Sequence, residues 1–177
     1  MAIVKLAPAF KDYLWGGTKL KESYGKKTDL DIVAESWELS THPDGESVVT
    51  TGSYAGMKLS EYVNALGKDC LGTKGNAFEF FPILIKFIDA KQPLSIQVHP
   101  DNEYALRVEK EYGKTEMWYV LDCEEGASLY FGVNKEVTKE EFEKQGWEKD
   151  DLLLTLVYTK NCIQGTLENK EGKIISE

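Results

Sequence analysis

Short runs rich in apolar residues, some of them alternating with polar residues, recur along the chain, and they predict a protein built mainly from strands. Turn-forming residues bound these runs, and His42-Pro43-Asp44-Gly45 predicts a turn between two extended segments. Strands are therefore expected at residues 36–40, 47–51, 82–89, 94–99, 115–123 and 127–133.

Three short helices are expected between these strands. Apolar residues spaced i, i+3, i+4 and i+7 around the early cap Ser60 predict a helical insertion at about residues 58–72. A second helix is expected to be capped by Asp101 and to run to about residue 112, and a third to follow the capping box of Thr138 and Glu141. Many short strands with few helices favour an antiparallel sandwich or barrel.

The segment 94–99 places three polar side chains on one face of its expected strand. Side chains alternate between the two faces of a strand, so Ser95, Gln97 and His99 lie together, opposite the aliphatic residues between them. Burying such groups unpaired costs roughly 1–3 kcal/mol each. The polar face is therefore either open to water or built to hold something.

Glu116 is an anionic residue inside another strand that has a buried character. An isolated carboxylate is rarely buried without a partner. Together with Gln97 and His99 it provides an oxygen, nitrogen and oxygen donor set, which suits a divalent metal such as zinc. A solvent-facing strand edge explains the same residues, and the pattern alone leaves both interpretations open.

Lys86 interrupts the most apolar of the expected strands. It either extends along apolar surface to reach water or faces a cavity that holds an anion. Lys114 lies two residues before Glu116 and can share its face of the strand, although a plain surface lysine is the commoner case. His42, in its turn, is a poor ligand candidate.

Composition narrows the classes of partner. The 177 residues are 42% hydrophobic and 29% charged, as in an ordinary globular domain, with a net charge of −9. This acidic balance argues against a nucleic-acid partner, which needs a basic patch. It leaves room for an anionic small molecule, because a few focused lysines can capture one phosphate.

Cysteine usage and the absence of long apolar runs indicate a cytoplasmic protein. Cys70, Cys123 and Cys162 are far apart and odd in number, which favours reduced, packed thiols. The first residues lack the apolar core of a secretion signal, and no run is long enough to cross a membrane. We therefore expect a reducing compartment and no membrane partner.

Five segments of the chain, in order, resemble those of the type I mannose-6-phosphate isomerases of the short bacterial kind. The likeness covers roughly residues 5 to 145 and is most specific around Gln97, His99, Lys114 and Glu116. The segments are Asp12-Tyr13-Leu14-Trp15-Gly16-Gly17, Ala34-Glu35-Ser36-Trp37-Glu38-Leu39-Ser40, Pro82-Ile83-Leu84-Ile85-Lys86-Phe87-Ile88-Asp89-Ala90, Leu94-Ser95-Ile96-Gln97-Val98-His99-Pro100-Asp101 and Gly113-Lys114-Thr115-Glu116-Met117-Trp118-Tyr119.

This resemblance implies a mainly β, cupin-like double-stranded β-helix, or jelly roll, with short helical insertions. It implies a Zn²⁺ ion bound by a Gln, a Glu and two His, of which Gln97, His99 and Glu116 match three. Lys86, Ser95 and Lys114 match positions that the family places near the sugar phosphate.

The implied reaction interconverts mannose 6-phosphate and fructose 6-phosphate, with Lys114 and Glu116 as catalytic candidates. A proton moves between C2 and C1 through an enediol, which requires a base and an electrophile that stabilises the developing oxyanion. Zinc supplies or supports that electrophile. The alternative is a cupin remnant that binds metal or sugar phosphate without catalysis.

The chain departs from the family pattern towards its end. No His follows His99 and no Arg follows Arg107, although the family has a fourth His ligand and a catalytic Arg later in the chain. We expect a C-terminally truncated or frame-altered product, with residues 1–154 as the N-terminal metal-binding part and 155–177 as a divergent polar tail. An incomplete barrel exposes strand edges, so self-association is expected.

Overall fold

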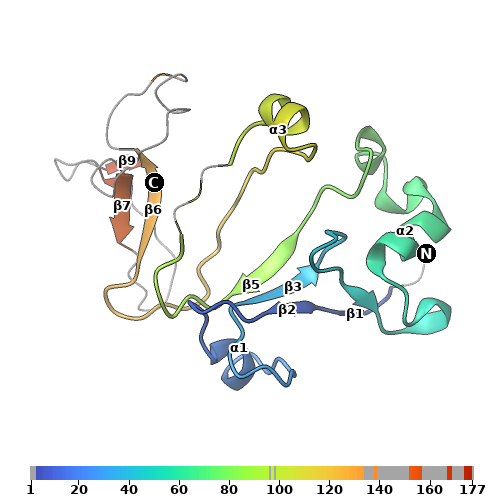
Figure 1. The fold of residues 1–177 in the computed structure, drawn as a ribbon, viewed down its shortest axis with the longest axis horizontal. Helices are drawn as coiled ribbons and strands as arrows, with labels where there is room; N and C mark the ends of the chain where they lie inside the picture. The colour runs from blue at the N-terminus through green and yellow to red at the C-terminus, as the bar shows by residue number, and fades with distance from the viewer. Residues whose placement is uncertain are drawn as a thin grey trace. The chain divides into compact units, whose positions relative to one another are not determined.

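The computed structural model of the chain describes residues 3–95, 97, 99–133, 138, 152–156, 167–168 and 174–176 (Figure 1). These residues belong to two compact units, Met1–Ser95 and Ile96–Glu177. Strands outnumber helices in the element order, so the prediction of a mainly β chain with few helices is confirmed. None of the described helices is long and apolar enough to span a membrane.

The first unit is organised around a three-stranded antiparallel sheet. Its strands are β2 (Ala9–Lys11), β3 (Glu35–Leu39) and β5 (Ile85–Ile88), with β3 in the centre. A second antiparallel pair joins β1 (Leu6–Ala7) to β4 (Val48–Val49). The strands expected at 36–40, 47–51 and 82–89 are therefore present, although each is displaced or shorter than expected.

Short helices connect these strands. They are α1 (Lys19–Glu22), α2 (Leu59–Leu66) and the 3-10 turns Gly52–Tyr54, Lys68–Leu71 and Gly75–Ala77. Val33, Ala34, Trp37, Val49 and Leu59 are buried and form much of the core of this unit. The helical insertion at residues 58–72 is confirmed.

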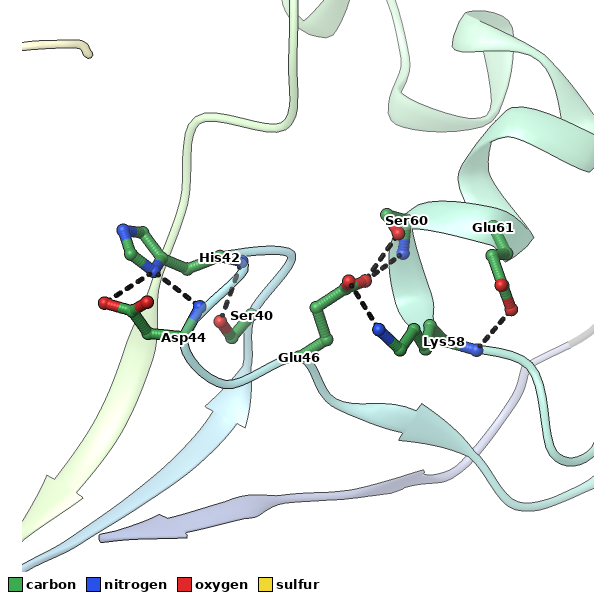
Figure 2. Close-up of polar contacts among 7 residues, drawn as sticks. All are labelled: Ser40, His42, Asp44, Glu46, Lys58, Ser60 and Glu61. Atoms are coloured by element: carbon green, nitrogen blue, oxygen red, sulfur yellow. Dashed lines mark hydrogen bonds and ion pairs between the residues drawn. The ribbon is translucent and has the colours of Figure 1, made fainter. Parts of the chain in front are cut away.

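The cap of α2 differs from the expected one (Figure 2). Lys58 is the N-cap, and its backbone N–H donates to the carboxylate of Glu61 at 3.0 Å. Ser60 lies inside the first turn, where both its N–H and its hydroxyl donate to Glu46, a residue of the preceding segment. A carboxylate is favourable there because the exposed N–H groups give the helix start a partial positive charge.

The second unit begins with α3 (Asn102–Val108) and continues through two strand pairs. Asp101 caps α3 as predicted, accepting from the backbone N–H of Tyr104 at 2.9 Å. The helix ends before residue 112, since Lys110 adopts a φ of 62°, which no helix can continue. The strand pairs are β6 (Ser128–Val133) with β7 (Leu152–Leu156), and β8 (Leu167–Glu168) with β9 (Ile174–Ser176).

Two expected strands are absent from the described residues. Neither the described part of 94–99 nor any of 115–123 belongs to a strand. Their residue types fit a strand, but a strand exists only when a neighbour pairs with its backbone. The helix expected after Thr138 lies outside the described residues, and so does most of the tail at 155–177. The division at residue 154 stays a prediction.

Candidate functional site

A cluster of three side chains in the second unit contains the residues that sequence patterns single out most strongly. Lys114 Nζ lies 2.6 Å from Glu116 Oε1 and 3.3 Å from His99 Nε2. His99 Nε2 and Glu116 Oε1 are themselves 3.4 Å apart. Three chemically different groups therefore converge from two segments of chain that are joined by α3.

The backbone brings these segments together at Gly113. The N–H of Gly113 donates to Asn102 Oδ1 at 2.9 Å, and the N–H of Lys114 donates to Pro100 O at 3.3 Å. A Cβ at position 113 would lie 2.4 Å from the carbonyl carbon of Asp101, so only glycine allows this approach. Lys114 is consequently held close to the segment that carries His99.

The electrostatics of the cluster keep Glu116 ionised. Partial burial of its carboxyl opposes ionisation, but the hydrogen bond and positive charge of Lys114, the indole N–H of Trp118 and the charge of His99 outweigh it. The pKa of Glu116 is lowered as a result. All three clustered side chains retain solvent contact, since 25% of His99, 30% of Glu116 and 40% of Lys114 is exposed.

The other expected site residues are placed less closely. Gln97 is exposed and lies two residues before His99, outside any strand. The shared strand face of Ser95, Gln97 and His99 is not formed among the described residues, because the segment is not paired as a strand. Ser95 and Lys86 belong to the first unit. Gln97 as a metal ligand and Ser95 as a phosphate donor remain predictions.

Lys86 lies in a second charged cluster, on one face of the three-stranded sheet. Its Nζ donates to Glu35 Oε1 at 2.9 Å, while the indole N–H of Trp37 donates to Glu35 Oε2 at 2.6 Å. The register explains the contact, since Lys86 pairs with Trp37 across the β3–β5 ladder and Glu35 is diagonal to it on that face. The ammonium of Lys86 therefore binds the Glu35 carboxylate. It does not simply extend to water, and in this arrangement it does not face an open anion site.

Sequence patterns alone missed the importance of Glu35. It is 5% exposed, and both of its carboxylate oxygens have donors. Lys11 adds positive charge on the same face, with Nζ 4.7 Å from the centre of the Trp37 ring. One sequence signal could have revealed this cluster. Glu35 and Trp37 are two residues apart in one strand, so they share a face of it, and that strand pairs with the strand of Lys86.

The contacts of His42 are those of a turn residue, as its position before Pro43 suggests (Figure 2). Its Nδ1 accepts the backbone N–H of Asp44 at 3.2 Å, and its ring packs edge-on against Trp37 with centroids 5.7 Å apart.

No group of three or more His, Cys, Asp and Glu side chains gathers as a metal site among the described residues. A metal site that includes His99 and Glu116 therefore needs a further ligand of another residue type.

Comparisons with known proteins identify the family of the chain. The family model "Phosphomannose isomerase type I, catalytic domain" matches residues 3–140. The mannose-6-phosphate isomerase of Streptococcus mutans is 40% identical over 148 residues, covering 83% of this chain and 46% of that protein. Mannose-6-phosphate isomerase ManA of Bacillus subtilis is 38% identical over 151 residues, covering 80% and 45%.

A solved structure extends the likeness to the fold. The crystal structure of the mannose 6-phosphate isomerase from Bacillus subtilis matches with a TM-score of 0.69 and 37% identity, covering 76% of this chain and 43% of that one. The chain spans less than half the length of these relatives. Its mainly β architecture is part of the cupin fold of phosphomannose isomerases. The chain belongs to the type I phosphomannose isomerase family and matches that family's catalytic domain.

Proposed function

We propose that this chain carries the metal- and substrate-binding part of a zinc-dependent isomerase that interconverts mannose 6-phosphate and fructose 6-phosphate. The observation that carries the proposal is the convergence of His99, Lys114 and Glu116 within a chain of this family. The relatives named above are mannose-6-phosphate isomerases, which supports the sugar phosphate as the substrate class.

The donors of the cluster fit zinc. Two ligands bound tetrahedrally at about 2.0–2.1 Å from zinc lie about 3.3 Å apart. The separation of His99 Nε2 and Glu116 Oε1, 3.4 Å, is close to that value. The ammonium of Lys114 lies beside both donors, which supports a site that attracts positive charge. Gln97 is the proposed third ligand. When bound, zinc would stabilise negative charge that develops on a substrate oxygen.

The lowered pKa of Glu116 supports different proposed tasks for Glu116 and Lys114. A carboxylate whose pKa is lowered is a weak base, so Glu116 is better suited to holding cations than to removing a carbon-bound proton. Lys114 is the proposed group that gives a proton to a substrate oxygen and takes one back, because its Nζ lies beside both proposed metal ligands, 2.6 Å from Glu116 and 3.3 Å from His99. Glu116 would then keep that amine in position.

The substrate phosphate needs cationic and hydroxyl donors, and Lys86, Ser95 and Lys114 are the proposed ones. Lys86 already donates to Glu35, so a phosphate would have to share it with a buried carboxylate. A lysine is a point charge without the two-pronged geometry of arginine. We therefore propose weak phosphate binding by this chain, in the cytoplasmic compartment where its thiols stay reduced.

A non-catalytic protein that binds zinc and sugar phosphate is the second candidate. One observation favours it, because no group of three or more His, Cys, Asp and Glu side chains gathers as a metal site in the part of the chain that the structure describes. Catalysis requires reacting groups held in near-attack geometry, and a site with fewer ligands holds them less firmly. The two candidates differ in turnover and share the same binding residues.

Calorimetry with zinc and mannose 6-phosphate tests the shared binding site. His99→Ala should abolish zinc binding, whereas His42→Ala, the matched change at the other histidine, should retain it. Lys86→Ala should weaken zinc-dependent sugar binding, with the exposed Lys74→Ala as control. Equal heats for His99→Ala and the wild-type chain would contradict the site. A coupled assay for fructose 6-phosphate then separates the two functions, since turnover excludes the non-catalytic candidate.

A further inference from the structure

Glu35 is a carboxylate in the interior of the first unit, with 5% of its surface exposed. Its oxygens accept from Lys86 Nζ at 2.9 Å and from the Trp37 indole N–H at 2.6 Å. The indole is neutral, so Lys86 supplies the only full positive charge in direct contact with this carboxylate among the described residues. A buried carboxylate that loses its cation is costly, and it becomes neutral by binding a proton instead.

Lys86 is the solvent-facing member of this pair. Of its side chain 21% is exposed, against 7% of the side chain of Glu35. An anion that arrives from water therefore meets the Lys86 ammonium, while Glu35 is held in place by the central strand β3 and by the Trp37 indole. A phosphate bound to Lys86 thus brings further negative charge to an ammonium that already neutralises a buried carboxylate.

The other ionisable groups near Glu35 do not take over this role. Lys11 lies directly opposite Glu35 across the β2–β3 ladder. Its Nζ, however, donates to Asp44 O at 2.5 Å and lies 4.7 Å from the centre of the Trp37 ring. Burial and the negative charge of Glu35 raise the pKa of the Tyr13 phenol, which therefore stays neutral and adds no positive charge. A proton from solvent is the remaining means of neutralising the carboxylate.

We propose that binding of a dianionic phosphate or sulfate group at Lys86 is coupled to the uptake of a proton by Glu35. The inference rests on the proposed function, which assigns the substrate phosphate to Lys86. The proton comes from water or buffer and forms an O–H bond on the carboxylate, so the acid can donate towards the bound anion where the carboxylate would repel it. The other oxygen of Glu35 keeps its hydrogen bond from the Trp37 indole.

A coupled proton gives the anion affinity a pH dependence of definite sign. Because the proton binds together with the anion, the affinity rises as the pH falls, by up to about tenfold for each pH unit. A phosphate ester itself loses charge near pH 6, which would weaken binding to a lysine over the same range. Inorganic sulfate stays dianionic there, so its binding reports the proton uptake of the protein alone.

Calorimetry with sodium sulfate at constant ionic strength, in two buffers with different heats of ionisation, tests the coupling. Between pH 5 and pH 7 we expect uptake of up to about one proton per sulfate and an affinity that falls as the pH rises. Glu35→Gln keeps an acceptor for the Trp37 indole and removes the titrating group. It should bind sulfate about tenfold or more tightly than wild type at pH 7, without proton uptake.

Glu38→Gln is the matched control on the same strand. Glu38 also pairs with a lysine, Lys26, and it accepts from the Ser36 hydroxyl on the face of β3 opposite to Glu35. This variant should keep the sulfate affinity and the pH dependence of the wild-type chain.

Infrared difference spectroscopy gives a second readout, which uses the wild-type protein. Addition of sulfate should produce the C=O stretching band of a protonated carboxylic acid. The band should be absent in Glu35→Gln. If that variant does not fold, Lys86→Ala replaces it and should lose the sulfate binding and the band together.

Sulfate binding without proton uptake would overturn the coupling and leave Lys86 as a phosphate donor. The coupling would also be overturned by a lack of sulfate binding, by binding that Lys86→Ala leaves unchanged, or by proton uptake that persists in Glu35→Gln. In each of these cases, zinc-dependent turnover of mannose 6-phosphate by the same protein would still support the proposed function. Proton uptake with sulfate but no turnover would refute the catalytic proposal and leave the coupling intact.

Discussion

Lys86–Glu35 in the first unit and Lys114–Glu116 in the second are both lysine–glutamate pairs, but they are held in different ways. The first lies on a hydrogen-bonded sheet, and its carboxylate is also bound by the Trp37 indole. The second lies on irregular backbone positioned by contacts at Gly113, and it is much more exposed. The sheet fixes the first pair on both strands, whereas the second pair is held by fewer contacts and is open to solvent, as the proposed binding of a metal or a substrate requires.

Breaking the buried pair should have the largest effect. Glu35→Ala leaves the Lys86 ammonium and the Trp37 N–H without their acceptor, and removing one partner of a buried pair costs about 3–5 kcal/mol. Urea denaturation followed by tryptophan fluorescence should show a loss near that size. Lys86 keeps some solvent contact, which places the expected value at the lower end.

The double change Glu35→Gln with Lys86→Met is the control for this effect. It removes both charges and keeps an acceptor for the Trp37 indole, so it should recover most of the stability lost in Glu35→Ala. An equal loss in both proteins would show that the charges of the pair, rather than the shape of the Glu35 side chain or its bond to the Trp37 indole, stabilise the sheet.

Moving the exposed pair should change zinc binding more than stability. Gly113→Val places carbon atoms where the backbone of Asp101 now lies and pushes Lys114 and Glu116 away from His99. Zinc affinity, measured by calorimetry, should fall by about tenfold or more, as when supports around metal ligands are removed. Gly72→Ala is the control for replacing a glycine elsewhere. The added Cβ meets nothing within 4 Å, and although the φ of 75° makes alanine less stable there, zinc affinity should be unchanged.

The elements that could be predicted from sequence are those determined by local patterns. The apolar spacing in residues 59–66 is enough for α2, and Asp101 is enough for the start of α3. The run 82–89 is apolar enough to indicate β5. The helix cap was predicted less well, because the carboxylate that binds Ser60 comes from Glu46, which lies fourteen residues earlier and outside any local capping pattern.

Features that depend on pairing could not be predicted in the same way. The types of residue in 115–121 favour a strand, but periodicity says nothing about whether a neighbour is present to form the ladder. The contact of Lys86 with Glu35 depends on the β3–β5 register, and the two residues are 51 positions apart in the sequence, beyond the reach of a local pattern. By contrast, the closeness of His99, Lys114 and Glu116 followed from the family resemblance.

Glu46 is a third carboxylate that can be compared with Glu35 and Glu116, and it stabilises the start of α2. Burial opposes its ionisation, but two hydrogen bonds from Ser60 and the charge of Lys58 outweigh burial and lower its pKa (Figure 2). A pKa that is lower in the folded state adds stability at neutral pH, and this contribution is lost as the pH falls through the folded pKa. Glu46→Gln should cost about 1 kcal/mol at pH 7 and progressively less in acid.

Thermal denaturation between pH 7 and pH 3 measures this effect. The wild-type chain and Glu46→Gln should converge in melting temperature as the pH falls, because protonation removes the charge that distinguishes them. Glu61→Gln is the matched control at the same helix, where the side chain accepts the Lys58 N–H. A constant difference between wild type and Glu46→Gln at every pH would mean that the ionised carboxylate contributes nothing beyond its hydrogen bonds.

The smallest effect is expected at Glu116 in the metal-free protein. Its pair with Lys114 is partly exposed, and such pairs contribute about 0–1 kcal/mol, less at high salt. Glu116→Gln should therefore lower the free energy of unfolding by less than about 1 kcal/mol in the presence of a chelator, and the difference should vanish in 1 M salt. The pKa of Glu116 is lowered in the folded state, so this contribution is present at neutral pH and is lost in acid. With zinc added, the same variant should lose the metal-induced rise in melting temperature, because it lacks the charge of a proposed metal ligand. A large loss of stability under chelation would contradict the contrast between the two pairs, since it would place Glu116 among the groups that hold the fold together.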